Sequence, residues 1–277
     1  MPEGPEVKST VDGLRHHLEN REILSFVPMS GRYSRKDFSG FLDLIEELPL
    51  LITGVGCKGK FIYFLFADGS SLWNTLGMTG YWGQGAKKHS RMRLWIKQDG
   101  QEDRRGDVLF YNDQRNFGTF KYVTTAEELE KKLDSLGPDM LSEPPTFDEF
   151  KKCLLRGKRG SKTIAENLMN QSVVSGVGNY LKAEILYAAK VSPWRLCKDL
   201  SDDELNNLLN LSHTIMNTSY KSGGATIRNY RNPDGRGGRF NRRFAVFGWD
   251  KDPWDRVVIK EKTPDKRTTH WCPEVQV

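Results

Sequence analysis

The sequence predicts an α+β fold, with an N-terminal antiparallel β-sandwich flanked by helices and a helical C-terminal part. Two observations support this. Seven short runs rich in β-branched and aromatic residues follow one another between residues 22 and 123, and glycine or Asp-Gly breaks separate several of them. From about residue 125 the apolar residues instead recur at helical spacing, which is typical of a different structural layer.

The N-terminal part begins with a predicted helix over residues 5–19, because Val7, Val11, Leu14 and Leu18 fall on one face. A second helix is predicted near 37–47. The predicted strands are 22–28, 50–57, 60–67, 71–76, 91–97, 107–112 and 118–123.

A Pro/Gly-rich stretch, LGPDMLSEPP, follows a helix predicted at 126–135 and marks a linker. We therefore expect an N-terminal domain over 1–124, a linker region over 125–145 and a C-terminal domain over 146–277. The C-terminal domain is expected to hold helices, then a basic loop over 223–243, then two strands and a turn within 244–277. Its predicted helices are 146–156, 162–169, 179–189 and 202–220.

Charge is distributed unevenly over the 277 residues. Residues 1–150 contain 19 Lys and Arg against 23 Asp and Glu, a net charge of −4, whereas residues 151–277 contain 23 against 13, a net charge of +10. This asymmetry favours a polyanion-binding surface in the second half, although a solvated basic face is the simpler alternative.

The four cysteines, Cys57, Cys153, Cys197 and Cys272, form no CxxC pair. Their spacing argues against a disulfide framework and against a cysteine-rich metal site. No apolar run has the length of a bilayer span, and no targeting signal is recognised, so we expect an intracellular protein without a membrane partner.

The N-terminus, MPEGPE, carries a candidate nucleophile. Once Met1 is removed, Pro2 has a free secondary amine, and Glu3 lies next to it. An α-amino group loses its proton at lower pH than a lysine amine, so more of it is nucleophilic at neutral pH. The simpler alternative is that these prolines only begin a helix.

A second candidate site is GVGNYLKAEILY, residues 176–187. A glycine turn that leads into a helix N-terminus presents backbone N–H groups that can bind phosphate, and Asn179 can add a side-chain donor. The alternative is an ordinary helix start capped by asparagine.

Four motifs occur together and in order: PEGPE, LGMTG (76–80), DQRNFG (113–118) and NQSVVSGVGNYLKAE (170–184). With them the chain resembles the formamidopyrimidine-DNA glycosylase/endonuclease VIII family from end to end. The resemblance implies a helix–two-turn–helix motif over about 146–222 and a finger over 244–277. It also implies an enzyme of base excision repair that excises oxidised bases and then cuts the strand at the abasic site.

The resemblance also implies roles for single residues. Pro2 matches the family's nucleophile, Glu3 its acid/base partner, and Lys60 a strand lysine that holds phosphate and assists base loss. Asn179 and Arg267 match its phosphate-binding residues. Three further positions match residues that fill the gap left by the extruded base: Met78, Arg115 and Phe117. Without the resemblance, the simpler interpretation of Lys60 is a snorkelling lysine, and Met78 and Phe117 would be interpreted as core residues.

Three features depart from the family pattern. The two CxxC pairs of the zinc finger read WDRV (254–257) and CPEV (272–275), so only Cys272 remains of four ligands. We therefore expect a zincless finger with no metal or cofactor, its core formed by Phe247, Trp254, Val257 and Trp271. A histidine common before Leu-Gly-Met is Thr75, and Asn116 replaces the second arginine of Arg-Arg-Phe-Gly.

The expected activity is a DNA glycosylase with AP lyase activity, acting as a monomer on double-stranded DNA that carries an oxidised base or an abasic site. The wording GNYLKAEILY and the zincless finger favour oxidised pyrimidines and hydantoins. Met78 and the GGATIRNY loop favour 8-oxoguanine and formamidopyrimidines instead. A non-catalytic damaged-DNA-binding protein is the third alternative.

Overall fold

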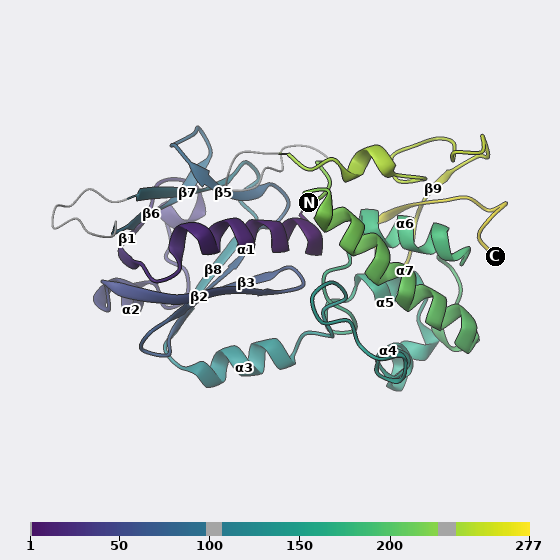
Figure 1. Ribbon diagram of the computed structural model, residues 1–277, viewed down its shortest axis with the longest axis horizontal. Coiled ribbons are helices and arrows are strands. Elements are labelled where there is room, and N and C mark those ends of the chain that lie inside the picture. The colour runs from purple at the N-terminus through teal and green to yellow at the C-terminus, as the bar shows by residue number, and fades with distance from the viewer. Residues whose placement is uncertain (1, 98–106, 227–236) are drawn as a thin grey trace. The chain divides into compact units, whose positions relative to one another are not determined.

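A computed structural model describes residues 2–97, 107–226 and 237–277 (Figure 1). The chain forms two compact units, here called the first and the second unit. The first comprises Met1–Pro2, Glu6–Asp134 and Gly223–Gly238. The second comprises Glu3–Pro5, Ser135–Ser222 and Arg239–Val277. The predicted domain boundaries stay a prediction.

The first unit contains an eight-stranded antiparallel sheet in the order β5-β7-β6-β1-β2-β3-β4-β8. Its two four-stranded halves are joined at β1 and β2 by two residue pairs, Glu22↔Leu51 and Ile23↔Leu50. The strands are β1 Glu22–Pro28, β2 Leu50–Lys58, β3 Phe61–Phe66, β4 Ser71–Thr75, β5 Gly80–Gln84, β6 Ser90–Ile96, β7 Asp107–Asp113 and β8 Thr119–Val123.

Aromatic side chains fill the space between the two halves. Trp82 on β5 contacts Phe64 on β3 and Phe120 on β8, with ring centroids 5.8 and 6.0 Å apart. Phe26 on β1 meets Phe120 edge-to-face at 5.5 Å. Each such pair contributes about 0.5–1.5 kcal/mol beyond its buried area. The two halves therefore face each other as the predicted β-sandwich.

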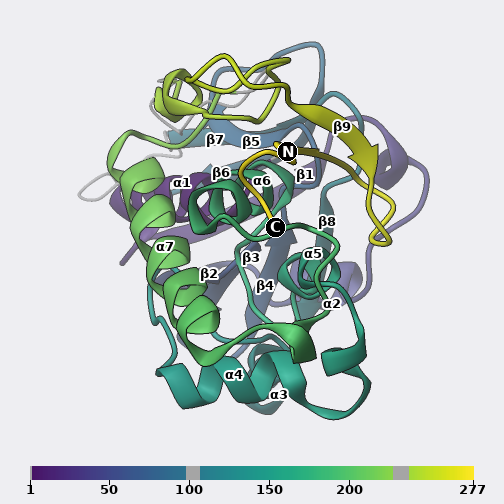
Figure 2. The same ribbon diagram turned by 90° about the vertical axis from the view of Figure 1, so that its right-hand side faces the viewer.

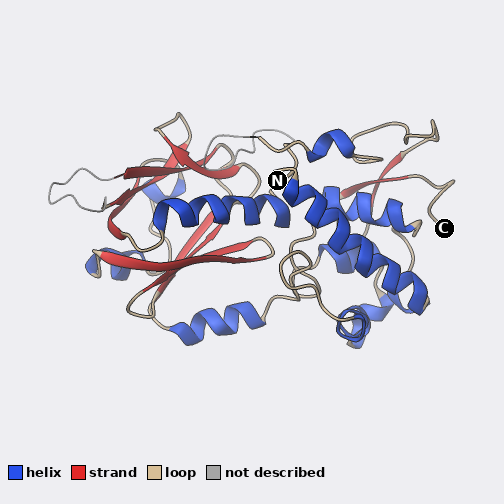
Figure 3. Cartoon of the chain, viewed as in Figure 1, coloured by secondary structure: helices blue, strands red, loops and turns tan. Residues whose placement is uncertain are grey.

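Helix α1 (Gly4–Leu18) runs beside these strands (Figure 3). The four residues of its predicted apolar face are buried in the same core as the sheet residues. The first unit also contains α2 (Phe41–Glu46), α3 (Ala126–Asp134) and the 3-10 turn η1 (Arg32–Ser34).

The second unit is built mainly of helices, of which α6 and α7 pack against each other (Figure 2). Capping boxes start three of them, with Thr146, Thr163 and Ser201 as N-caps. The helices are α4 Phe147–Leu155, α5 Ile164–Met169, α6 Asn179–Ala189 and α7 Asp202–Lys221, with 3-10 turns η2 Gly157–Ser161, η3 Cys197–Asp199 and η4 Phe240–Arg243. The C-terminal hairpin consists of β9 (Ile259–Lys262) and β10 (Thr268–Trp271).

The structure corrects two predictions. Strand β5 was not predicted, because its five residues, GYWGQ, include two glycines and show no clear alternation. The predicted finger core is wrong at Trp254 and Val257, whose side chains are 69% and 58% exposed. The core is instead formed by Val246, Val258 and Cys272, and α6 supplies Ala183 and Tyr187 to the same cluster.

Three of the predicted basic-loop arginines, Arg228, Arg231 and Arg236, lie outside the described residues. Among the residues that are described, no helix has the length and apolar content to cross a bilayer.

Candidate active site

Pro2 and Glu3 immediately precede α1, and both are buried. The Glu3 carboxylate accepts hydrogen bonds from two backbone amides at the start of α6. Tyr180 N lies 3.0 Å from Oε1 and Leu181 N lies 3.2 Å from Oε2. A helix N-terminus stabilises negative charge, so α6 fixes the position of the carboxylate that follows the proline.

The N-terminus of α6 therefore does not match its prediction. The glycine turn was expected to leave backbone N–H groups free for phosphate, but those of Tyr180 and Leu181 are used by Glu3. Gly178 is the N-cap and supplies no side-chain cap. A Cβ there would lie 2.2 Å from the Glu3 Cδ, so a residue without a side chain is required for the carboxylate to reach the helix.

The loop before α6 is shaped by Gln171. Its Nε2 donates to Val177 O at 3.0 Å, and its Oε1 accepts from Gly176 N at 3.0 Å. Gly176 has φ +95°, a conformation that favours glycine. Its carbonyl accepts a hydrogen bond of 2.8 Å from Gly4 N. The loop is thus bound to the first turn of α1, next to Glu3.

Lys60 lies in the two-residue turn between β2 and β3, one residue before the strand that it was predicted to open. The turn is possible because Gly59 adopts φ +58°. Lys60 is half-buried and interacts with other groups of the protein.

Met78, Arg115 and Phe117 lie on two turns at one edge of the sandwich. Strand pairing brings the turns together, because Thr75 pairs with Thr119 and Gly80 pairs with Asp113. The Arg115 guanidinium lies 4.8 Å from the centre of the Phe117 ring. Phe117 is 51% exposed and Met78 is half-buried, so the alternative that both are core residues is wrong for Phe117.

Asp113 organises the second of these turns. Its Oδ2 accepts from Gly118 N at 2.7 Å, and its Oδ1 accepts from Arg115 N at 3.2 Å. Arg115 N also donates to Thr79 Oγ1 at 3.0 Å, which ties the turn to its neighbour. Arg115 and Phe117 are therefore presented together on a braced loop.

Asn179 and Arg267 come together in the second unit. Asn179 Nδ2 donates to Thr268 O at 2.9 Å, next to Arg267 in the chain. A side-chain amide has two N–H groups, so one remains for a second acceptor. Asn179 Oδ1 is buried without a partner among the described residues. The Arg267 side chain is exposed at the end of the hairpin turn.

The residues that hold the finger to α6 were not predicted from the sequence. The Glu184 carboxylate accepts three backbone N–H groups, from Ala245 (2.7 Å), Val246 (3.1 Å) and Phe247 (2.8 Å). Burial raises the pKa of Glu184, and these three hydrogen bonds oppose the rise. Lys182, two residues earlier in α6, binds Asp265 in the finger. Charged residues on a mostly apolar helix were the available signal.

The residues at the four expected zinc-ligand positions do not fit a zinc ion. They are Trp254, Val257, Cys272 and Val275. Only Cys272 has ligand chemistry, and its side chain is buried in the apolar cluster with Val246 and Val258. A tetrahedral zinc site needs four N, O or S ligands, which these four positions do not supply.

The site can be compared with known proteins. The formamidopyrimidine-DNA glycosylase N-terminal domain matches residues 1–120, and the formamidopyrimidine-DNA glycosylase H2TH domain matches residues 136–231. A formamidopyrimidine-DNA glycosylase of Oceanobacillus iheyensis is 32% identical over all of this chain and 98% of its own length. One from Thermus thermophilus is 30% identical with the same coverage.

Solved structures show the same similarity. The MutM (Fpg) protein of Thermus thermophilus superposes with a TM-score of 0.85 at 29% identity, over 99% of this chain and 98% of that one. A Lactococcus lactis Fpg mutant in complex with Fapy-dG-containing DNA gives a TM-score of 0.84 at 26% identity, over 99% of both chains.

These matches confirm the predicted enzyme class, a DNA glycosylase with AP lyase activity. With two family domains that together span most of its length, the chain belongs to the formamidopyrimidine-DNA glycosylase family of DNA-repair enzymes.

Proposed function

We propose that Pro2 attacks C1′ of a nucleotide that carries an oxidised base, and that Glu3 moves protons in this reaction. The observation that carries the proposal is the buried Glu3 carboxylate, which two amides of α6 hold directly after the proline in the chain. A general acid or base must be fixed near the group that it serves, and this carboxylate is fixed.

The proposed reaction runs through a covalent intermediate between Pro2 and the sugar. The Pro2 nitrogen forms a bond to C1′ as the damaged base leaves with a proton, and opening of the sugar gives an iminium ion. The iminium withdraws electrons and acidifies the C2′ hydrogen. Loss of that proton expels the 3′ phosphate by β-elimination, and a second elimination expels the 5′ phosphate. Hydrolysis of the iminium then releases the sugar fragment and restores the amine.

This chemistry requires Pro2 to be the first residue of the working enzyme, since an amide nitrogen is not nucleophilic. Mass spectrometry of the N-terminal peptide after trapping tests this directly. An active enzyme that retains Met1 would refute the proposed nucleophile.

Other residues are proposed to hold the DNA. Lys60, Asn179 and Arg267 would bind phosphates that flank the lesion, and these contacts carry no sequence information. Met78, Arg115 and Phe117 would fill the space left by the extruded nucleotide. Extrusion costs a few kcal/mol, and an apolar wedge with a cation offsets part of that cost.

Borohydride trapping on a duplex with an abasic site tests the catalytic role. The wild-type chain is expected to give a covalent adduct, and Pro2→Gly is expected to lose most of it. Glu3→Gln should slow base excision far more than cleavage of a preformed abasic site. Equal loss of both activities would contradict the separate role of Glu3, and the absence of any wild-type adduct would favour a non-catalytic DNA-binding protein.

The proposed substrates are oxidised pyrimidines and hydantoins in double-stranded DNA, and the proposed enzyme is a monomer inside the cell. The finger without a zinc-ligand set supports this lesion class. The second candidate is a preference for 8-oxoguanine and formamidopyrimidines, which the names of the relatives favour. Single-turnover excision of thymine glycol, 5-hydroxyuracil, hydantoin and 8-oxoguanine distinguishes the two by the order of the rates.

A further inference from the structure

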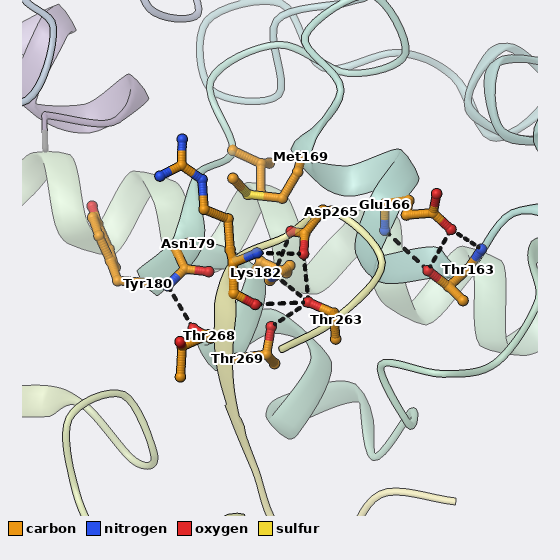
Figure 4. A network of polar contacts seen from close by, with 12 residues as sticks. Thr163, Glu166, Met169, Asn179, Tyr180, Lys182, Thr263, Asp265, Thr268 and Thr269 are labelled. Atoms are coloured by element: carbon orange, nitrogen blue, oxygen red, sulfur yellow. Dashed lines mark hydrogen bonds and ion pairs between the residues drawn. The ribbon is translucent and has the colours of Figure 1, made fainter. Parts of the chain in front are cut away.

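A lysine ammonium group lies fully buried between α6 and the C-terminal hairpin. The side chain of Lys182 is 0% exposed, and that of its partner Asp265 is 7% exposed. Lys182 Nζ lies 2.6 Å from Asp265 Oδ2 and 3.2 Å from Thr263 Oγ1 (Figure 4). The contact joins residues that are 83 positions apart in the chain.

A buried charge is stable only when it is paired and hydrogen-bonded. Burial lowers the pKa of Lys182, and the hydrogen bond and charge of Asp265 oppose this shift. Such a pair adds little stability compared with apolar packing, but it can fix the geometry of the groups that it joins.

The pair fixes the turn that carries Arg267. The second oxygen of Asp265, Oδ1, accepts from Arg267 N at 3.2 Å and from the Thr263 hydroxyl. Thr263 N donates to Arg267 O at 3.1 Å, which closes the turn. The Thr263 hydroxyl also contacts Thr269 Oγ1 at 2.9 Å, so the network continues into β10 (Figure 4).

Helix α6 also holds the other side of the same arginine. Asn179, three residues before Lys182, donates to Thr268 O at 2.9 Å (Figure 4). Asn179 thus binds the residue after Arg267, while Lys182, through Asp265, binds the backbone of Arg267 itself. One turn of α6 therefore fixes the backbone position from which the exposed Arg267 side chain extends.

We propose that Lys182 is a positioning residue, which with Asp265 orients Arg267 so that Arg267 and Asn179 grip the same DNA strand. In this finger the expected zinc-ligand positions cannot form a tetrahedral site, and the buried ion pair to α6 fixes the hairpin turn instead. The inference rests on the proposed function in one respect, the assignment of Arg267 to a DNA phosphate.

The test measures binding of the full chain to a duplex that contains a tetrahydrofuran abasic-site analogue, over a range of salt concentrations. The variants are Lys182→Met, Lys182→Arg, Arg267→Ala and the double variant Lys182→Met/Arg267→Ala. Lys151→Met is the matched control, because Lys151 forms an exposed ion pair with Asp202 at 2.7 Å in the same unit. Circular dichroism and urea unfolding establish that each variant is folded.

Lys182→Met is expected to weaken binding about tenfold, the loss of one charged hydrogen bond. The plot of log K against log salt should become less steep by about 0.9, which is the effect of one lost phosphate contact. The double variant should bind no more weakly than Arg267→Ala, because both changes remove the same contact. Lys182→Arg should restore binding, and Lys151→Met should match the wild type.

Additive losses in the double variant, or an unchanged salt slope in Lys182→Met, would overturn the positioning role. If Lys182→Met does not fold, Asp265→Asn replaces it, since this change removes the charge and keeps the shape; wild-type binding by Asp265→Asn would likewise overturn it. If Arg267→Ala itself binds as the wild type does, the phosphate assignment fails, which is a distinct result from failure of the positioning role.

Discussion

Replacing Gly178 by alanine tests whether the Glu3 carboxylate must sit at the N-terminus of α6. The new Cβ would lie 2.2 Å from the Glu3 Cδ, whereas ordinary contacts begin at 3.4 Å, so the carboxylate must move by about 1.2 Å. That movement breaks or lengthens the hydrogen bonds from Tyr180 N and Leu181 N. A misplacement of about 1 Å in a catalytic group can cost ~10²-fold in rate, so base excision should fall by about that factor.

The assay is single-turnover excision of an oxidised base, compared with cleavage of a preformed abasic site by the same protein. Gly160→Ala is the control, because its Cβ would meet its nearest neighbours at 3.7 Å. A Gly178→Ala enzyme that excises bases at the wild-type rate would show that Glu3 does not need its contacts to the helix.

Three further changes test other parts of the molecule. Phe117→Ala should slow excision from duplex DNA about tenfold and leave lyase action on single-stranded abasic DNA unchanged, because we propose that the exposed ring stabilises the extruded state. Equal losses on both substrates in single-turnover assays would contradict the wedge role. Glu184→Gln should lower the free energy of unfolding by about 1–3 kcal/mol, because one carbonyl cannot serve three backbone donors, and an unchanged urea midpoint would disprove it. Burial lowers the pKa of His270 below its usual 6.5, so the unfolded chain takes up the proton at a higher pH than the folded chain. The free energy of unfolding should therefore fall as the pH drops through and below 6.5. His270→Phe should remove this part of the pH dependence, measured by urea unfolding at pH 5.5 and 7.5.

Local patterns were sufficient for most of the fold. The apolar face of α1 and the seven predicted strands were readable because side-chain periodicity of 3.6 or 2 reports directly on which face is buried. Strand β5 was missed because Trp82, its one fully buried large residue, lies in a five-residue run with two glycines and no clear alternation. The identity of the family was also available from motifs, and the proposed chemistry of Pro2 and Glu3 follows from their residue types.

The family, the fold class and the candidate residues of the N-terminus, the two sandwich turns and the hairpin could therefore be inferred from motifs and residue types. The folded chain was needed to show that Glu3 occupies the amides at the start of α6, which had been expected to remain free for phosphate. It was also needed to show that the finger packs on Ala183 and Tyr187 and is joined to α6 by Lys182. The physical reason is distance along the chain: Glu3 and Tyr180 are 177 residues apart, and a contact between such positions leaves no periodic trace in either segment.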